Sequence, residues 1–171
     1  MTYRAFLSEY DAFRTEYYPS PERWEEYALD DGEPIKDSKN WSAGVKYLKD
    51  DTHVSREINK LPNNIGGIYL FYIEGGSLSF MEKYILYIGR CKYTEHQNIR
   101  KRAKQYISDE RQFIKKMFKL WGPYLHYKYY GDIDNGRIAR YERALILAIA
   151  PPFNDSIPEK IEVEPERPAF K

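Results

Sequence analysis

Two short runs of β-branched and aromatic residues constrain the fold of this chain more than any other feature. Residues 67–73 read GIYLFYI and residues 83–89 read KYILYIG, with Gly75-Gly76 between them. Ile, Tyr and Phe favour the pleated, half-buried surface of a strand, whereas Gly favours the reversal between two strands. The sequence therefore predicts a β-hairpin with an extended tip.

After this hairpin the apolar residues take up a helical period. Residues 98–107 and 108–122 predict two helices, residues 124–130 alternate as a third strand would, and residues 137–150 predict a last helix. Asp109 is the expected N-cap of the second helix, whose apolar stripe is Phe113, Ile114, Met117, Phe118 and Trp121. The expected fold class is α+β, a small three-stranded, mainly antiparallel sheet flanked by helices.

The front of the chain differs in character. Residues 1–66 contain 9 Lys and Arg against 13 Asp and Glu. The apolar spacing predicts a helix over residues 3–18 and another over 20–29, followed by a loop over 30–40. Two more short helices are expected over 42–51 and 51–61. We therefore expect a helical N-terminal extension over residues 1–62, packed on or beside a core over 63–156, and a C-terminal tail over 157–171.

Positive charge gathers in one stretch of an almost neutral protein. Residues 90–119 contain 10 Lys and Arg against 3 Asp and Glu, although the whole chain has a net charge of +1. Such a stripe is a candidate footprint for a polyanion, and it is also what a solvated helix face looks like. The charge pattern leaves both interpretations open.

One acidic residue interrupts the apolar stripe of the last helix. Glu142 stands among Ile138, Leu145, Ile146 and Ile149 at helical spacing. Burial of an unpaired carboxylate costs several kcal/mol. Glu142 therefore either reaches solvent or pairs with a nearby Arg140 or Arg143, or it lines a polar site and holds a cation.

A second unusual pair lies on the basic helix. Arg102 and Tyr106 are four residues apart and share a face. Facing the tyrosines of the hairpin, they would form a phosphate clamp beside a phenol. The structural alternative is an arginine stacked on aromatic rings for packing.

Together these residues resemble the GIY-YIG nuclease family. The match consists of Gly67-Ile68-Tyr69, Tyr87-Ile88-Gly89, the basic Arg90, the helix with Arg102 and Tyr106, Glu142 on a later helix, and Asn154 after two prolines. Single triplets of this kind are weak, whereas their joint order across about half the chain is specific. The chain departs from the family pattern in a longer gap between Tyr69 and Tyr87 and in a longer loop over residues 91–98.

The resemblance implies a metal-dependent endonuclease that hydrolyses DNA phosphodiester bonds, in restriction, phage defence or a mobile element. Arg102 would bind the scissile phosphate, and Glu142 would be the only protein ligand of one Mg²⁺ or Mn²⁺ ion. Either Tyr69 or Tyr87 could be the general base once nearby cations favour its phenolate, and we favour Tyr69, with Tyr87 positioning the water. Tyr106 would hydrogen-bond the phosphate or tune Tyr69, and Asn154 would hold the local geometry.

The expected partner is DNA, bound through phosphate contacts that weaken with salt. The residues expected to make these contacts are Arg90, Lys92, Arg100, Lys101 and Lys104. A homodimer or a partner protein could dock on the N-terminal helices. No apolar run reaches the length of a membrane span, so we expect a cytoplasmic protein without membrane contact.

Two other functions stay open at this point. The chain could be a catalytically inactive nucleic-acid-binding module that keeps the GIY-YIG fold, or a structural domain whose aromatic residues only pack. The His126-Tyr127-Lys128 triplet is similar to the His-x-Lys of phospholipase-D-type enzymes, but that motif requires Asp where this chain has Ile133. The single Cys91 predicts neither a disulfide nor a zinc site.

Overall fold

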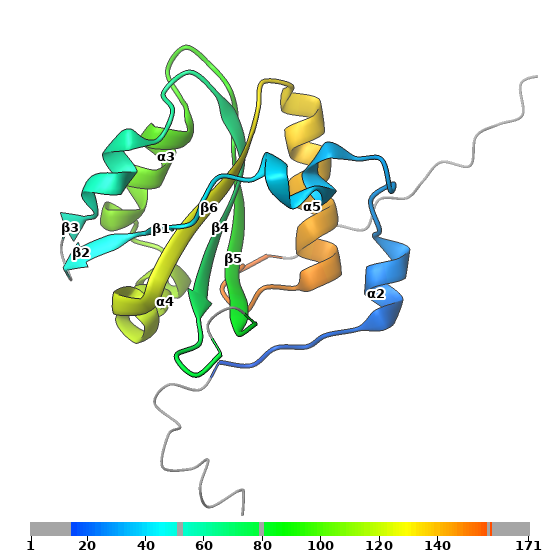
Figure 1. The fold of residues 1–171 in the computed structure, drawn as a ribbon, viewed down its shortest axis with the longest axis horizontal. Helices are drawn as coiled ribbons and strands as arrows, with labels where there is room; N and C mark the ends of the chain where they lie inside the picture. Colours follow the sequence, from blue (N-terminus) through cyan, green and yellow to red (C-terminus); the bar gives the residue numbers. More distant parts are fainter. Residues whose placement is uncertain (1–14, 51–52, 79–80, 157, 159–171) are drawn as a thin grey trace, which may run out of the picture.

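A four-stranded antiparallel sheet stands at the centre of the protein and carries helices on both faces (Figure 1). The computed structural model describes residues 15–50, 53–78, 81–156 and 158. Along the sheet the strand order is β1-β6-β4-β5. The bounds are β1 Val45–Lys46, β4 Gly66–Glu74, β5 Lys83–Cys91 and β6 Leu125–Asp132.

The predicted hairpin is the pair β4 and β5. Its register places Tyr69 opposite Gly89 and Phe71 opposite Tyr87. Because side chains alternate along a strand, Tyr69 and Tyr87 project from the same face of the sheet. Gly67 has a φ of 142°, and a Cβ there would lie 2.0 Å from the carbonyl oxygen of Tyr130 on the neighbouring strand β6. Only glycine therefore fits this position.

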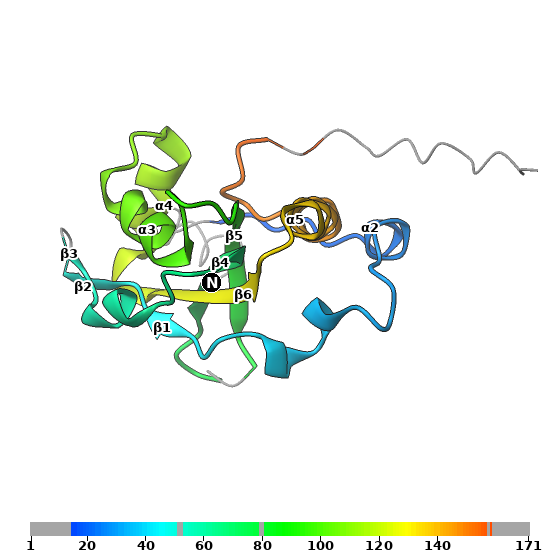
Figure 2. The ribbon, with the colours of Figure 1, turned by 90° about the horizontal axis from the view of Figure 1, so that it is seen from above.

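Helices cover the two faces unequally (Figure 2). The face that carries Tyr69 packs against α3 (Ile99–Gln105) and α4 (Gln112–Trp121), joined by the 3-10 helix η5 (Tyr106–Ser108). The opposite face packs against α5 (Asn135–Ile149), with α2 (Pro21–Glu26) beside α5. The sheet therefore separates two apolar cores.

The larger core lies under α3 and α4. Ile114 and Met117 of α4 are fully buried there, and Phe113, Phe118 and Trp121 pack against it, which confirms the predicted stripe. The smaller core lies under α5 and contains Ile35, Ile68, Ile88, Tyr130, Ile138, Tyr141 and Ile146. At about 25 cal/mol per Å² of apolar surface, burial on both faces is the dominant stabilisation of such a sheet.

The expectation of a helical front is wrong for residues 42–61. Residues 45–46 form β1, which gives the predicted three-stranded sheet a fourth strand by pairing with β6, and β2 (Leu48–Asp50) pairs with β3 (His53–Val54). Among the described residues of this stretch, 42–50 and 53–61, the only helix is the 3-10 turn η4 (Arg56–Lys60). Val45 and Leu48 have helical spacing, but the open edge of β6 and the burial of Tyr47 favour an extended backbone.

The rest of the front is mostly irregular. The helix predicted over 20–29 begins as expected, with Ser20 accepting a hydrogen bond from the Arg23 amide, and ends at Glu26. Two 3-10 turns follow, η2 (Pro34–Lys36) and η3 (Ser38–Asn40). Residues 15–18 contain no helix, and the rest of the helix predicted over 3–18 lies outside the described residues.

The predicted C-terminal tail also lies outside the described residues, apart from Pro158. No helix in the described part of the chain has the length and apolar character needed to cross a bilayer.

Candidate active site

A cavity of about 330 Å³ opens at the β5 edge of the sheet, where side chains from both faces meet. The hairpin supplies Tyr69, Tyr87 and Arg90 to it, and α3 supplies Arg102. Its lining residues are Tyr69, Tyr87, Arg90, Arg102, Arg111, Glu142, Ile146, Asn154, Asp155, Ser156 and Pro158. Six residues singled out from widely separated parts of the sequence therefore line one cavity: Tyr69, Tyr87, Arg90, Arg102, Glu142 and Asn154.

Three phenol hydroxyls form a connected cluster behind the cavity. The Oη atoms of Tyr69 and Tyr106 lie 2.6 Å apart, and Tyr106 Oη donates to Tyr87 Oη at 3.2 Å. Gly89 makes room for this cluster, since a Cβ there would lie 2.5 Å from Tyr69 Oη. Gly89 of the second triplet therefore leaves the space over β5 that the ring of Tyr69, from the first triplet, occupies.

The hydrogen bonds give the cluster a direction. Each phenol has a single proton, so Tyr106, which donates to Tyr87, must accept from Tyr69. Arg102 Nε in turn donates to Tyr69 Oη at 3.0 Å, and Arg102 Nη2 donates to Tyr106 Oη at 3.4 Å. The chain therefore begins at the Arg102 guanidinium and ends at the hydroxyl of Tyr87.

Burial raises the pKa of all three phenols above the ordinary value. Tyr69 and Tyr106 are almost completely buried, so water cannot solvate the negative charge of their phenolates. The positive charge of Arg102 lowers the pKa of Tyr69 and Tyr106, and Arg111 lowers that of Tyr87, but burial outweighs both arginines. In the free protein the phenols are therefore neutral at neutral pH.

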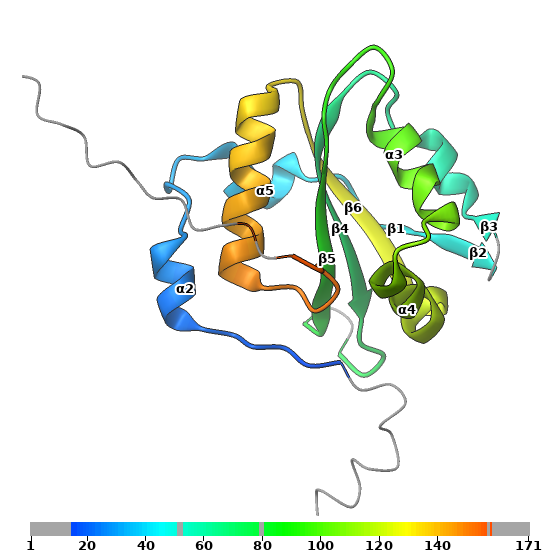
Figure 3. The same ribbon diagram turned by 180° about the vertical axis from the view of Figure 1, so that it is seen from behind.

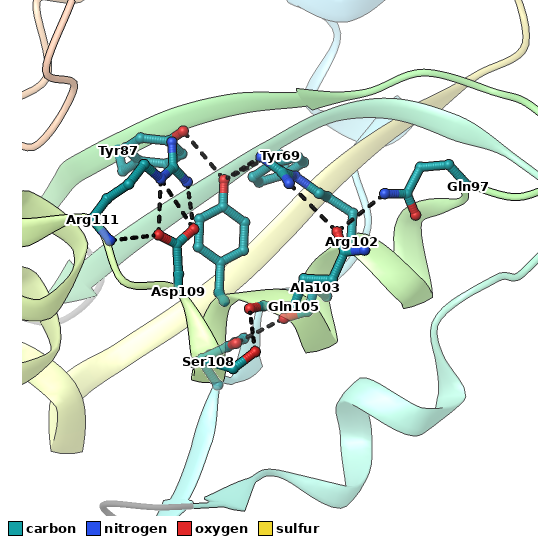
Figure 4. Close-up of polar contacts among 11 residues, drawn as sticks. Tyr69, Tyr87, Gln97, Arg102, Ala103, Gln105, Ser108, Asp109 and Arg111 are labelled. Carbon is teal, nitrogen blue, oxygen red and sulfur yellow. Dashed lines mark hydrogen bonds and ion pairs between the residues drawn. The ribbon is translucent and has the colours of Figure 1, made fainter.

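Two arginines flank the hydroxyl cluster (Figure 4). Arg102 lies beside Tyr69, whereas Arg111 lies beside Tyr87 and over Asp109. The guanidinium carbons of Arg102 and Arg111 are 5.0 Å and 5.6 Å from the centre of the Tyr106 ring. Two cations therefore lie against the Tyr106 ring at the cavity wall.

Glu142 reaches the cavity from α5, across the sheet from α3. Its Oε2 forms an ion pair with Arg90 Nε at 3.0 Å, so its partner is on β5 and not Arg140 or Arg143 of its own helix. The side chain of Glu142 is 20% exposed. Burial raises the pKa of this carboxyl, while Arg90 and, more weakly, Arg102 lower it.

The donor set suits a hard cation with few protein ligands. Within the described residues no three His, Cys, Asp or Glu side chains come together, so a metal here would keep most of its water. A water takes about 30 Å³ in the liquid, so a cavity of 330 Å³ has space for a hydrated ion beside a phosphate group. Glu142 fits the single carboxylate ligand of such an ion.

Asn154 fastens the segment after α5 to the edge of β5 (Figure 3). Its Oδ1 accepts from the Ile88 amide at 3.0 Å, and its Nδ2 donates to the Ile88 carbonyl at 2.8 Å. The Phe153 amide also donates to Leu86, at 3.0 Å. This pairing covers an otherwise open strand edge and fixes Tyr87 and Asn154 side by side.

Most of the residues expected to bind DNA lie elsewhere. Only Arg90 of that group lines the cavity, and Lys92, Lys101 and Lys104 are exposed outside it. Arg100 donates from Nε to the Leu61 carbonyl, which ties α3 to the loop before β4.

Two other residues considered in the sequence also lie apart from the cavity. His126 is on β6 against the Tyr72 ring. Cys91 is buried, and burial raises the pKa of its thiol to about 11.

Sequence reasoning did not assign five of the lining residues to a site, namely Arg111, Ile146, Asp155, Ser156 and Pro158. Asp109 is not the N-cap of α4 as predicted, because that position belongs to Arg111. The Asp109 carboxylate instead accepts hydrogen bonds from the backbone amide and the guanidinium of Arg111. No helix or strand period in the sequence singles out Arg111.

Comparisons of this chain with protein-family models, with curated proteins and with solved structures find no match.

Proposed function

We propose that this protein is a metal-dependent endonuclease of the GIY-YIG type that hydrolyses phosphodiester bonds of DNA. The observation that carries the proposal is the shared cavity of Glu142, Arg102 and the phenols of Tyr69 and Tyr87. Phosphodiester hydrolysis needs an anchored phosphate, a directed water and relief of growing negative charge. The cavity offers a group for each of these tasks.

Arg102 is the group that would anchor the scissile phosphate. Two of its nitrogens donate to Tyr69 and Tyr106, which hold the guanidinium in one orientation at the cavity wall. The remaining donors of the planar fork match phosphate oxygens in a bidentate pair. An arginine already held by two phenols loses little freedom when the phosphate arrives.

Tyr69 and Tyr87 are the two phenols among the residues that line the cavity. Tyr69 is neutral in the free protein, so it would act as general base only as its phenolate, which the charge-assisted hydrogen bond from Arg102 Nε and the positive charge of an ion held by Glu142 would favour. Tyr87 suits the role of orienting the water, because it ends the hydrogen-bond chain and keeps its own proton for donation. Tyr106 connects the two and touches neither water nor phosphate in this scheme.

Glu142 would hold the cation, with Arg90 neutralising the carboxylate in its absence. A Mg²⁺ or Mn²⁺ ion bound there would polarise a phosphoryl oxygen and stabilise the charge of the departing oxygen. Asn154 would keep β5 and the segment after α5 in register, so that Tyr87 and Glu142 face the same space.

The test is cleavage of a panel of labelled DNA and RNA substrates by the purified protein, with and without Mg²⁺. The proposal expects Mg²⁺-dependent cutting of DNA, lost by at least about 100-fold in Glu142→Gln and in Arg102→Lys, because each removes a group that acts on the transition state. Glu95→Gln is the matched control, since Glu95 is exposed outside the cavity. Cutting by Glu142→Gln at the wild-type rate would remove the proposed metal site.

The second candidate is an inactive nucleic-acid-binding module. The intact set of Tyr69, Arg102 and Glu142 around one cavity favours the enzyme over it. DNA binding of equal strength in wild type and Glu142→Gln, without cutting in any metal, would instead support the binding module.

A further inference from the structure

We propose that Arg111 is a second phosphate-binding residue, which holds the backbone phosphate next to the one that Arg102 anchors. This inference rests on the proposed nuclease function and adds to it a substrate feature, a strand with at least two consecutive phosphates in the cavity. Arg111 belongs to none of the motifs found in the sequence, and the structure places it at the wall of the same cavity.

Hydrogen bonds to Asp109 fix the orientation of the Arg111 side chain. Its Nε donates to Asp109 Oδ1 at 2.9 Å, and its Nη2 donates to Asp109 Oδ2 at 2.7 Å. The Arg111 amide also donates to Asp109 Oδ1, at 3.0 Å. A guanidinium has five N–H donors, so the two that bind Asp109 leave three for other partners.

The position of Arg111 complements that of Arg102. The two guanidinium groups stand around one ring, that of Tyr106, and flank the hydroxyl cluster on its Tyr87 and Tyr69 sides (Figure 4). Both guanidinium carbons lie within 5.6 Å of the centre of the Tyr106 ring, so one wall of the cavity carries two cations, as two consecutive backbone phosphates would require. The site thus offers one arginine for each of two consecutive phosphates.

A purely structural role does not account for the exposure of this arginine. The Arg111 side chain is 37% exposed and its partner Asp109 is 15% exposed, so the carboxylate is the buried member and the cation faces the cavity. Arg90, the third arginine there, pairs with Glu142 of α5, whereas Arg111 stands with Arg102 around the Tyr106 ring. Arg111 is therefore the cation best placed to meet a second phosphate beside Arg102.

The experiment measures the dissociation constant of a short fluorescein-labelled DNA duplex as a function of NaCl concentration, in EDTA so that no cutting occurs. Each lost phosphate contact lowers the slope of log K against log salt by about 0.9. Arg111→Gln is expected to lower the slope by about that amount. Lys119→Gln, which removes one exposed charge from the same helix outside the cavity, is expected to leave the slope unchanged.

Two more variants separate phosphate binding from a structural effect. Asp109→Asn removes the negative partner and leaves Arg111 in place, so it is expected to tighten DNA binding, whereas a merely structural ion pair predicts the same loss as Arg111→Gln. Arg111→Lys retains the charge and is expected to keep the wild-type slope with weaker binding. Melting temperatures of all variants show that they are folded.

The outcomes distinguish this inference from the function on which it rests. A wild-type protein that neither cuts nor binds DNA overturns both. A wild-type protein that cuts DNA, together with an unchanged slope for Arg111→Gln or weakened binding by Asp109→Asn, overturns the role of Arg111 alone.

Discussion

Gly89→Ala is the substitution that most sharply tests the packing of the two tyrosine-bearing strands. The added Cβ would lie 2.5 Å from Oη, 2.7 Å from Cζ and 2.8 Å from Cε2 of Tyr69. The Tyr69 ring is fully buried and stacks on Tyr127 at 5.5 Å between ring centres, so it has no free space to enter. Either the ring or β5 must move.

The expected cost follows from this contact. Overpacking of a filled core costs about 1–3 kcal/mol. For a protein of this size, each kcal/mol lowers the melting temperature by about 2–4 °C. A displaced Tyr69 also misplaces Arg102 and Tyr106, which are bonded to its hydroxyl, and an error of about 1 Å in such a group costs about 100-fold in rate.

The assay is urea unfolding of a double-mutant cycle. Gly89 has no positive φ, so Ala fits the strand backbone, and without the Tyr69 ring the same substitution is expected to be neutral or to stabilise by about 0.4–1 kcal/mol. Gly89→Ala is therefore measured in the wild type and in a Tyr69→Leu background. Gly76→Ala, with nothing within 4 Å of its Cβ, is the control. An equal cost in both backgrounds would refute the contact as the reason for glycine.

Three further predictions follow from single contacts. Tyr127→Phe is expected to leave the free energy of unfolding unchanged or to raise it by about 1 kcal/mol, because the buried Tyr127 Oη has no hydrogen-bond partner among the described residues, and a clear loss in urea unfolding would contradict this. Glu142→Gln is expected to raise the melting temperature at pH 7, since burial raises the pKa of Glu142 and the folded state therefore disfavours the charged carboxylate. This gain is expected to vanish as the pH falls below about 4.3, where the Glu142 carboxyl is protonated in both the folded and the unfolded protein. A gain in melting temperature that increases at acid pH would contradict this explanation. Asn154→Ala removes two hydrogen bonds to Ile88 and is expected to cost about 1–3 kcal/mol, with faster hydrogen exchange at the Ile88 amide, whereas the exposed Asn63→Ala serves as a neutral control.

The elements with strong local patterns could be predicted from the sequence. The hairpin is specified by aromatic and β-branched residues on either side of a glycine pair, and α4 by a stripe that begins at Phe113. Glu142 stood out because a carboxylate conflicts with the stripe around it. In each case the physical cause lies in residues that are neighbours in the sequence.

The features that depend on distant partners could not be predicted. β1 is only Val45–Lys46, and it is a strand because β6 offers an open edge some eighty residues later in the chain. The sequence offers Arg140 and Arg143 of the same helix as partners for Glu142, whereas the ion pair in the structure joins Glu142 to Arg90 of β5. Arg111 reaches the cavity only because η5 turns the chain between α3 and α4, and no local period predicts that turn.

A crystal structure of the protein with a short DNA duplex and Mn²⁺ tests the central claim most directly. The account predicts one anomalous Mn²⁺ peak bound to Glu142, with Arg90 released from the carboxylate, and a DNA phosphate in contact with Arg102 in the same cavity. A Mn²⁺ ion away from Glu142, or DNA bound with its phosphates outside the cavity, would contradict it.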